Sequence, residues 1–255
     1  MEDPVLEMKH ISKSFAGIPV LKNITLQAKQ GEVHAVVGEN GAGKSTLMKI
    51  LMGIHSADEG EVRVHGRKVI FRNPGQAIAC GVSMIHQELN PVPDMDVSEN
   101  LFLGREIRRG KLGGRILVDR QAQLRRTAEL LQQFGLSISP RQWMRNLSVA
   151  EIQMIEILKA GSISSQVIIM DEPTSAITQW EAERLFQQID RLREQGVAIL
   201  YISHKMEEIF RIADRITVLR DGNWIGTFPK SEINRDTLVR KMVGREIGEF
   251  LPKVE

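Results

Sequence analysis

Cysteine is nearly absent from this sequence of 255 residues, in which Cys80 is the only one. An internal disulfide framework is therefore excluded, and a lone thiol fits a reducing compartment. Net charge is also small, since 34 basic and 32 acidic side chains leave +2 at pH 7. A surface that binds nucleic acid through bulk positive charge is therefore not expected, and no nucleic-acid partner is predicted.

Long apolar runs are missing as well. No stretch approaches the roughly 20 apolar residues that a membrane-spanning helix needs. The N-terminal "MEDPVLEMKH" is acidic and lacks the apolar core of a signal peptide. We therefore expect the protein to meet a membrane only through a partner. With 42% hydrophobic residues, the chain can bury one sizeable core and carry a smaller subdomain.

The order of apolar segments predicts an α/β fold. Residues 5–11, 19–28, 32–38 and 61–66 alternate or run apolar as strands do, and residues 97–160 are mostly helical in pattern. Buried-looking strands at 166–172, 198–203 and 215–222 then alternate with helices, which indicates a parallel sheet covered on both faces. The glycine-rich, basic stretch 107–119 is interpreted as a solvated loop.

The segment "GENGAGKST" has the P-loop pattern, between a predicted strand and a predicted helix. Glycines let backbone N–H groups approach phosphate oxygens, and the helix that follows directs its positive end at them. Lys44 would supply charge to the β- and γ-phosphates, and the Ser45 hydroxyl can ligate Mg²⁺. The predicted nucleotide-binding residues are Gly38, Glu39, Asn40, Gly41, Ala42, Gly43, Lys44, Ser45 and Thr46. A nucleoside triphosphate ligand is therefore expected.

Two acids follow the apolar strand "VIIM" at its carboxyl end, where ligands bind in open α/β sheets. Asp171 would hold Mg²⁺ and Glu172 would polarise the attacking water. A strand that simply ends in two solvated acids is the alternative, which the nearby P-loop pattern disfavours.

Ser148 and Glu151 have the spacing of a capping box at the start of "LSVAEIQMIEILKA". Apolar residues recur at helical spacing behind them, so a capped surface helix is the plain structural interpretation. The position of this helix, shortly before the acidic strand, gives a second interpretation below.

In this order the P-loop, the serine-headed helix and the acidic strand resemble the ATP-binding-cassette (ABC) ATPases. The resemblance implies that Phe15 stacks on adenine, that Gln87 touches Mg²⁺ and the attacking water, and that His204 contacts the γ-phosphate. Each has a plain structural alternative: a strand-end aromatic, a loop amide and a hydrogen-bonded histidine. The family also implies that two cassettes pair head to tail, so that Ser148, Val149, Ala150 and Glu151 close over the partner's ATP.

The sequence departs from the family at two places. Val149 and Ala150 replace the two glycines of the family's "LSGGQ", and Glu151 replaces its glutamine. Thr178 replaces an aspartate of the loop after the acidic strand. Both departures resemble the first half of the tandem ATPases of bacterial monosaccharide importers of the ribose, galactose and xylose type. The methyl of Ala150 would hinder close approach of the backbone, and the Glu151 carboxylate would repel phosphates unless the capping box holds it, so the trans site made by this helix is expected to be weakened or inactive.

The resemblance implies a RecA-like parallel-sheet core, an N-terminal antiparallel β subdomain and an α-helical signature subdomain. We expect residues 1–255 to form a single ABC ATPase domain, with the core and β subdomain at about 1–90 and 163–255 and the helical subdomain at about 91–162. The implied cofactors are ATP and Mg²⁺. The implied partners are a second ABC domain, transmembrane permease subunits and, indirectly, a periplasmic or extracellular sugar-binding protein. The implied location is the cytoplasmic face of the membrane, as a peripheral subunit.

The resemblance implies a subunit that binds and hydrolyses ATP to energise import of a sugar, expected to be a monosaccharide, through an ABC permease. Two other functions stay open. One is a non-transport cassette ATPase of translation or DNA repair, although the insertions and charged linkers of those proteins are missing here. The other is a regulatory nucleotide-binding half with little turnover, which Ala150 and Thr178 favour.

Overall fold

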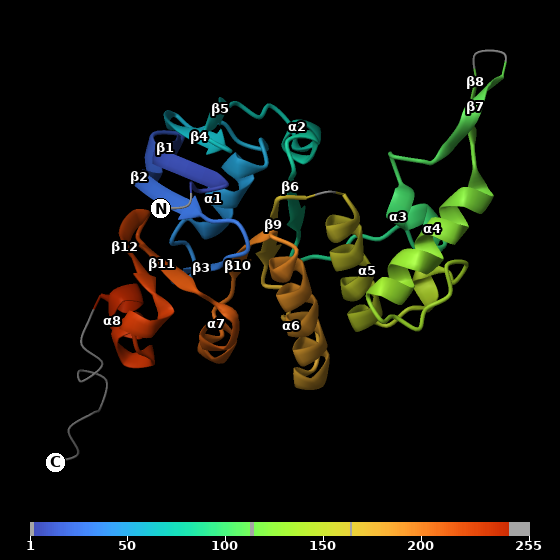
Figure 1. The fold of residues 1–255 in the computed structure, drawn as a ribbon. Helices are drawn as coiled ribbons and strands as arrows, with labels where there is room; N and C mark the ends of the chain where they lie inside the picture. Colours follow the sequence, from blue (N-terminus) through green and yellow to red (C-terminus); the bar gives the residue numbers. More distant parts are fainter. Residues whose placement is uncertain (1–2, 113–114, 164, 245–255) are drawn as a thin grey trace. The chain divides into compact units, whose positions relative to one another are not determined.

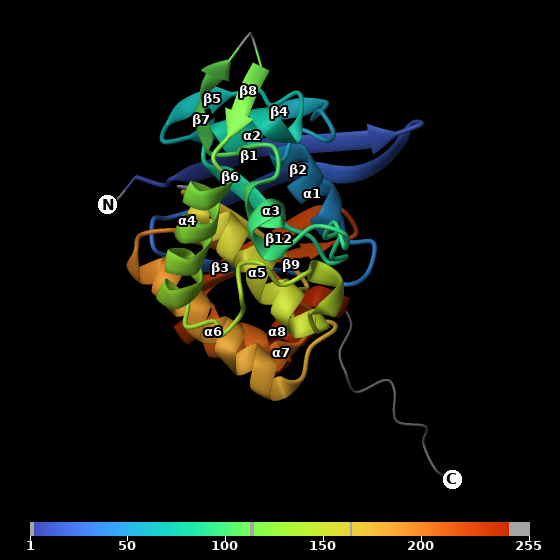
Figure 2. The same ribbon diagram turned by 90° about the vertical axis from the view of Figure 1, so that its right-hand side faces the viewer.

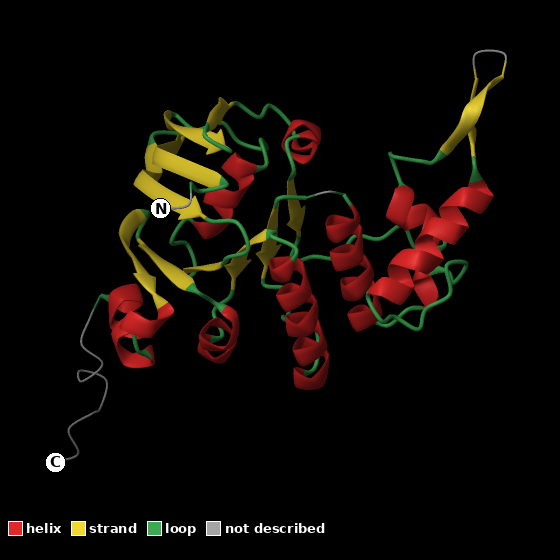
Figure 3. Cartoon of the chain, viewed as in Figure 1, coloured by secondary structure: helices red, strands yellow, loops and turns green. Residues whose placement is uncertain are grey.

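The computed structural model describes residues 3–112, 115–163 and 165–244. The chain divides into two compact units. The first holds Met1–Met84, Ser165–Glu172 and Ile189–Glu255, and the second holds Ile85–Ser164 and Pro173–Gln188. Figure 1 labels the elements along the chain, and Figure 3 colours them by type.

The first unit is built on one mixed sheet whose strand order is β5-β4-β1-β2-β12-β11-β3-β10-β9-β6. Strands β1, β2, β4 and β5 pair antiparallel, whereas β11, β3, β10 and β9 are parallel neighbours. The strands are β1 (Leu6–Phe15), β2 (Ile18–Ala28), β3 (Val33–Val37), β4 (Glu59–Val64), β5 (Arg67–Val69), β6 (Val82–Ile85), β9 (Val167–Asp171), β10 (Ala198–Ile202), β11 (Arg215–Arg220) and β12 (Asn223–Pro229).

Helices cover both faces of the parallel strands. These helices are α1 (Lys44–Leu51), α2 (Pro74–Ala79), α7 (Met206–Ile212), η2 (Lys230–Glu232) and α8 (Arg235–Val243). All five residues of β3 are buried, and they alternate between two cores. Val36 packs with α1, whereas Ala35 and Val37 pack with α7 and α8. Figures 1 and 2 show α7 and α8 together on one side of these strands. The predicted doubly covered parallel sheet is confirmed.

The second unit is mainly helical. It contains α3 (Val97–Phe102), the antiparallel pair β7 (Arg108–Leu112) and β8 (Arg115–Val118), α4 (Arg120–Gln133), η1 (Met144–Asn146), α5 (Val149–Ser162) and most of α6 (Gln179–Glu194). Buried Asn100 joins α3 to the preceding segment, because its Oδ1 accepts from Val92 N at 2.8 Å and its Nδ2 donates to Val92 O at 3.0 Å. Such paired amide bonds fix the start of this unit.

One prediction was wrong. The stretch 107–119, interpreted as a loop, holds the hairpin β7–β8. Glycine and basic residues suggested solvent exposure, which edge strands also tolerate, so composition could not separate the two. Residues 113 and 114, which join these strands, lie outside the described residues. Within the described ranges, none of the helices combines the length and apolarity needed to cross a membrane.

Candidate active site

The turn between β3 and α1 has glycine where other residues do not fit. A Cβ at Gly38 would lie 2.3 Å from the carbonyl oxygen of Leu219, and a Cβ at Gly43 would lie 2.5 Å from Leu21 Cδ2. Gly43 also has φ of +101°, and Gly41 has φ of +84° with no atom within 4 Å of its Cβ position. The turn thus packs against its own unit at both ends and leaves its middle open for close approach of a ligand to the backbone.

Helix α1 begins with N–H groups that no side chain caps within the described part of the chain, and its first turn holds no acidic residue. Most other helix starts differ, since α2, α3, α4, α5 and α8 each have a side-chain cap. The first N–H groups of a helix carry partial positive charge and are satisfied by an anion. The start of α1 therefore fits phosphate oxygens.

Lys44 is the first residue of α1 and is 9% exposed. Its Nζ donates to the carbonyl oxygens of Gly38 at 2.7 Å and Glu39 at 3.0 Å. Burial lowers the pKa of this ammonium group, while the charges of Glu172 and Asp171 act in the opposite direction. A lysine and two acids therefore share one electrostatic environment at the carboxyl ends of β3 and β9, which are both parallel to β10.

Glu172 has an uncommon backbone conformation, with φ of +46°. Its N–H donates to Ile202 O at 2.9 Å, which ties this position to the end of β10. Its Oε1 lies 3.0 Å from Nδ1 of His204. The Glu172 side chain is 19% exposed and that of His204 is 61% exposed, so the imidazole is the more accessible member of the pair. A strained position beside a histidine is typical of functional sites.

Oxygen ligands for a divalent cation are few at this site. No group of three or more His, Cys, Asp or Glu side chains that could hold a metal occurs among the residues that the structure describes. In nucleotide sites Mg²⁺ takes one or two protein oxygens together with phosphates and water. Buried Asp171 and exposed Ser45 fit that requirement, so the site suits a cation that arrives with the nucleotide.

Phe15 ends β1 with its side chain 39% exposed. His55 contacts the Phe15 ring edge-on, with centroids 5.1 Å apart and planes at 71°. The Lys13 ammonium lies 5.4 Å from the ring centroid. An accessible ring held by two neighbours can stack on a planar base.

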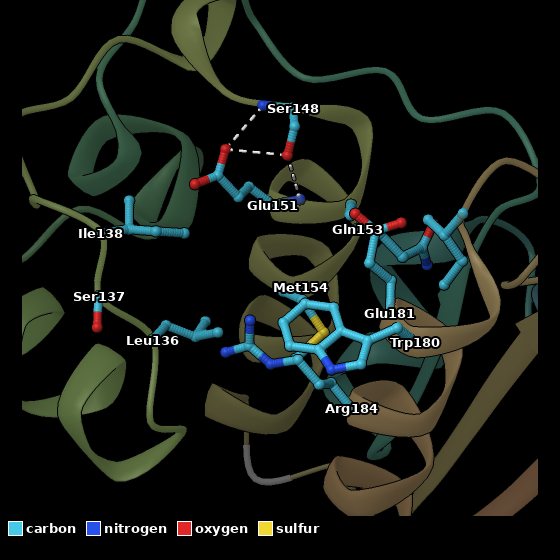
Figure 4. Close-up of a pocket in the computed structure, with 12 residues that line it drawn as sticks. Leu136, Ser137, Ile138, Ser148, Glu151, Gln153, Met154, Trp180, Glu181 and Arg184 are labelled. Atoms are coloured by element: carbon cyan, nitrogen blue, oxygen red, sulfur yellow. Dashed lines mark hydrogen bonds between the residues drawn. The ribbon is translucent and has the colours of Figure 1, made fainter.

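Ser148 is the N-cap of α5 in the second unit, and the predicted capping box is confirmed. The Ser148 N–H and O–H donate to Glu151 Oε2 at 2.8 and 3.0 Å, and the Glu151 N–H donates to Ser148 Oγ at 3.3 Å (Figure 4). Val149 is 48% exposed. Ala150 lines a cavity of about 360 Å³ together with Trp180 and other residues of this unit. This helix start therefore presents a serine that already bonds a carboxylate.

The predicted site residues fall into two groups. Phe15, residues 38–46, Asp171, Glu172 and His204 belong to the first unit, and Gln87 and residues 148–151 belong to the second. Gln87 is exposed and lies just beyond the end of β6.

A family model described as "ABC transporter" matches residues 21–175, which is more than half of the chain. The chain belongs to the ABC transporter family. This ABC protein is 47% identical over 249 residues to the "Galactose/methyl galactoside import ATP-binding protein MglA" of Clostridium perfringens (strain 13 / Type A), which covers 98% of the chain and 47% of the relative. It is 50% identical over 252 residues to "Galactose/methyl galactoside import ATP-binding protein MglA 1" of Photobacterium profundum, covering 99% and 50%.

The chain thus spans about half the length of the curated relatives it matches. The predicted resemblance to monosaccharide import ATPases is confirmed by these relatives. Solved structures agree on the fold. The ADP conformation of MJ1267, an ATP-binding cassette of an ABC transporter, matches with a TM-score of 0.80 at 24% identity and covers 95% of this chain and 98% of its own. The dimeric cassette MJ0796, bound to ADP and Pi, matches with a TM-score of 0.73 at 23% identity, covering 88% and 98%. The predicted ABC ATPase fold is therefore confirmed, and a domain of this family binds nucleotide.

One buried carboxylate of the first unit could not be recognised from the sequence. Tyr201 and Ser203, on either side of the end of β10, both donate to the carboxylate of Glu208 on α7. Glu207 and Glu208 are adjacent in the sequence, and only their burial distinguishes them. The available signal was weak: Glu208 precedes the buried Ile209 on a short helix, where a polar residue needs partners.

Proposed function

We propose that this chain binds and hydrolyses ATP and that this reaction energises import of a monosaccharide through an ABC permease. The observation that carries the proposal is the contact of Glu172 with His204. Glu172 directly follows β9, and its charge acts on the P-loop residue Lys44. The similarity to galactose import ATP-binding proteins supports a monosaccharide as the transported class. The chain spans about half the length of those relatives, so in this proposal the import activity requires a second cassette.

The P-loop would hold the triphosphate. Backbone N–H groups of residues 38–46 and the start of α1 would bind phosphate oxygens, and the Lys44 ammonium would exchange backbone carbonyls for the β- and γ-phosphates. Phe15 would stack on the adenine. Ser45 and Gln87 would hold Mg²⁺ directly and Asp171 would hold it through water, and the bound ion would neutralise the developing phosphate charge.

Glu172 would act on the water that attacks the γ-phosphorus. Its carboxylate would accept a proton from that water, and the P–O bond to ADP would break as the new bond forms. His204 would contact the γ-phosphate and, through its contact with Glu172, keep the carboxylate directed at the water. Neither role requires a metal cluster of the protein's own.

A second cassette would complete the site. In this proposal two ABC domains pair head to tail, and residues 148–151 of one domain close over the nucleotide of the other. A dimer is described for the cassette MJ0796, which shares the fold. Gln87 would link the nucleotide to transmembrane permease subunits on the cytoplasmic face of the membrane, where the protein would be peripheral. A periplasmic or extracellular sugar-binding protein would deliver the sugar. The helical signature subdomain, at about residues 91–162, would form most of the second unit.

A regulatory half with little turnover is supported by one observation. Glu151 occupies both the N–H and the O–H of Ser148, so a phosphate approaching this serine would meet a carboxylate already bound there. Repulsion between the two anions would weaken the trans site. Replacing Glu151 with glutamine, the family residue, should raise ATP turnover of the complete protein at the site that α5 closes.

Nucleotide binding is tested with two lysines of α1. We expect Lys44→Ala to weaken ATP binding at least about tenfold, because it removes a charge-assisted contact to the phosphates. Lys49→Ala is the matched control, since Lys49 lies on the same helix with an exposed side chain. Titration calorimetry of both variants measures the affinities. Equal ATP affinity in the two variants would show that Lys44 does not bind the phosphates.

Import is tested by co-purification. The complete protein should be recovered from detergent-solubilised membranes with permease subunits, and its ATPase rate in vesicles should rise when the sugar-binding protein carries galactose or ribose. A complete protein that sediments alone and hydrolyses ATP at one rate under all these conditions would favour the non-transport cassette.

A further inference from the structure

We infer that Glu208 is a positioning residue that holds His204 against Glu172. The inference rests on the proposed function, in which these two side chains act on ATP. Glu208 lies on α7 and is 8% exposed. Its carboxylate binds residues that flank His204 in the chain, and its effect on the imidazole passes through them.

The Glu208 carboxylate binds residues on both sides of His204. The O–H groups of Tyr201 and Ser203 donate to its Oε2 at 2.8 and 3.0 Å. The ammonium of Lys205 lies 3.2 Å from its Oε1. A buried carboxylate is costly unless hydrogen bonds satisfy it, so these donors and this acceptor fix one another.

A hydrogen bond within the segment 203–205 also restrains it. The Lys205 N–H donates to Ser203 Oγ at 3.0 Å, so Ser203 bridges the backbone of Lys205 and the carboxylate of Glu208. His204 stands between two residues that the same carboxylate binds. Its own side chain is 61% exposed and contacts Glu172 at 3.0 Å.

An exposed side chain loses rotamer freedom when it is held in one contact. Few contacts hold the exposed ring itself, so the position of the His204 backbone determines the fraction of time for which the ring contacts Glu172. If the hydrogen bonds to the Glu208 carboxylate are weakened, the backbone of residues 203–205 becomes more mobile. The His204 imidazole then loses its contact with Glu172 for part of the time. The consequence for the reaction is a loss of orientation with no loss of a nucleotide contact.

The sequence provides a matched control next to Glu208. Glu207 is the preceding residue of the same helix, and its side chain is 85% exposed, with its partner Arg235 at 4.0 Å. Glu208→Gln and Glu207→Gln remove the same charge from neighbouring positions. Only Glu208→Gln replaces the carboxylate that accepts hydrogen bonds from Tyr201 and Ser203.

The first test measures ATP hydrolysis by the complete protein. We expect Glu208→Gln to lower kcat about tenfold or more while KM for ATP stays within about twofold, because the change affects orientation in the reaction and not binding. Glu207→Gln should keep both parameters. Tyr201→Phe removes one donor, so its kcat should lie between those of the wild type and Glu208→Gln. An unchanged kcat in Glu208→Gln would overturn the inference.

The second test needs no turnover. In this chain labelled with ¹³C at histidine Cε1, six histidine signals are expected, and the His204 signal is the one lost in His204→Gln. Glu208→Gln should displace that signal in the direction that Glu172→Ala displaces it, and Glu207→Gln should leave it in place. A His204 signal unmoved by Glu208→Gln contradicts the inference even where the wild type hydrolyses ATP. If the wild type does not hydrolyse ATP, the proposed function is wrong, but the inference about Glu208 is still tested by whether the His204 signal moves.

Discussion

Replacing Gly38 with alanine tests how tightly the P-loop packs on its own unit. The added Cβ would lie 2.3 Å from Leu219 O and 2.9 Å from Ala42 Cβ. The first neighbour is backbone of β11, so relief requires a shift of a strand and not of a flexible side chain. Overpacking of this kind costs about 3 kcal/mol. In a domain of this size each kcal/mol lowers Tm by about 2–4 °C, so the expected loss is roughly 6–12 °C.

Gly41→Ala is the control for that loss. No atom lies within 4 Å of its Cβ position, and only the positive φ of +84° opposes alanine. The left-handed conformation costs about 1 kcal/mol, which predicts a Tm loss of about 2–4 °C. Thermal unfolding followed by circular dichroism, with both variants at one protein concentration, measures the difference. Equal losses in Gly38→Ala and Gly41→Ala would refute the packing argument.

Three other substitutions have defined effects on stability. Gln153 is 4% exposed and its Nε2 has no hydrogen-bond partner in the described residues, so Gln153→Met should raise the free energy of unfolding in urea by about 1 kcal/mol. Half-buried Arg105 donates to Ser162 Oγ at 2.8 Å and to nearby carbonyls, so Arg105→Met should lower the same quantity by about 2 kcal/mol. Burial raises the pKa of Glu32, but the neighbouring His34, the Lys29 N–H and Arg215 outweigh it and hold that pKa below its ordinary value. The Glu32 carboxylate therefore stabilises the fold above its ordinary pKa, and this stabilisation is lost as the pH falls through its lowered pKa in the folded state. Urea titrations should show Glu32→Gln less stable than the wild type at neutral pH, with a difference that shrinks as the pH is lowered below the ordinary glutamate pKa.

The features that could be predicted from the sequence are those that depend on residues close together in the chain. The P-loop turn, the capping box at Ser148 and the buried strand before Asp171 each depend on residues within a few positions of one another, so their patterns are readable in order. The contact of Glu172 with His204 is between residues 32 apart, and only the family resemblance placed these residues in one site.

Long-range pairing explains what could not be predicted. The position of β12 between β2 and β11 depends on contacts far apart in the chain, which no local period encodes. The hairpin β7–β8 has the composition of a loop. Glu208 has a sequence context almost identical to that of Glu207, and only the packing of α7 against the sheet buries one and exposes the other.

In the proposed reaction Glu172 acts in the chemical step of ATP hydrolysis, whereas other residues, the P-loop foremost, bind the nucleotide. This assignment is tested most directly by measuring phosphate release and ATP affinity in the same preparations of the complete protein, wild type and Glu172→Gln. We expect Glu172→Gln to bind ATP within about twofold of the wild type and to release phosphate at least about a hundredfold more slowly. Phosphate release at the wild-type rate by Glu172→Gln would contradict it.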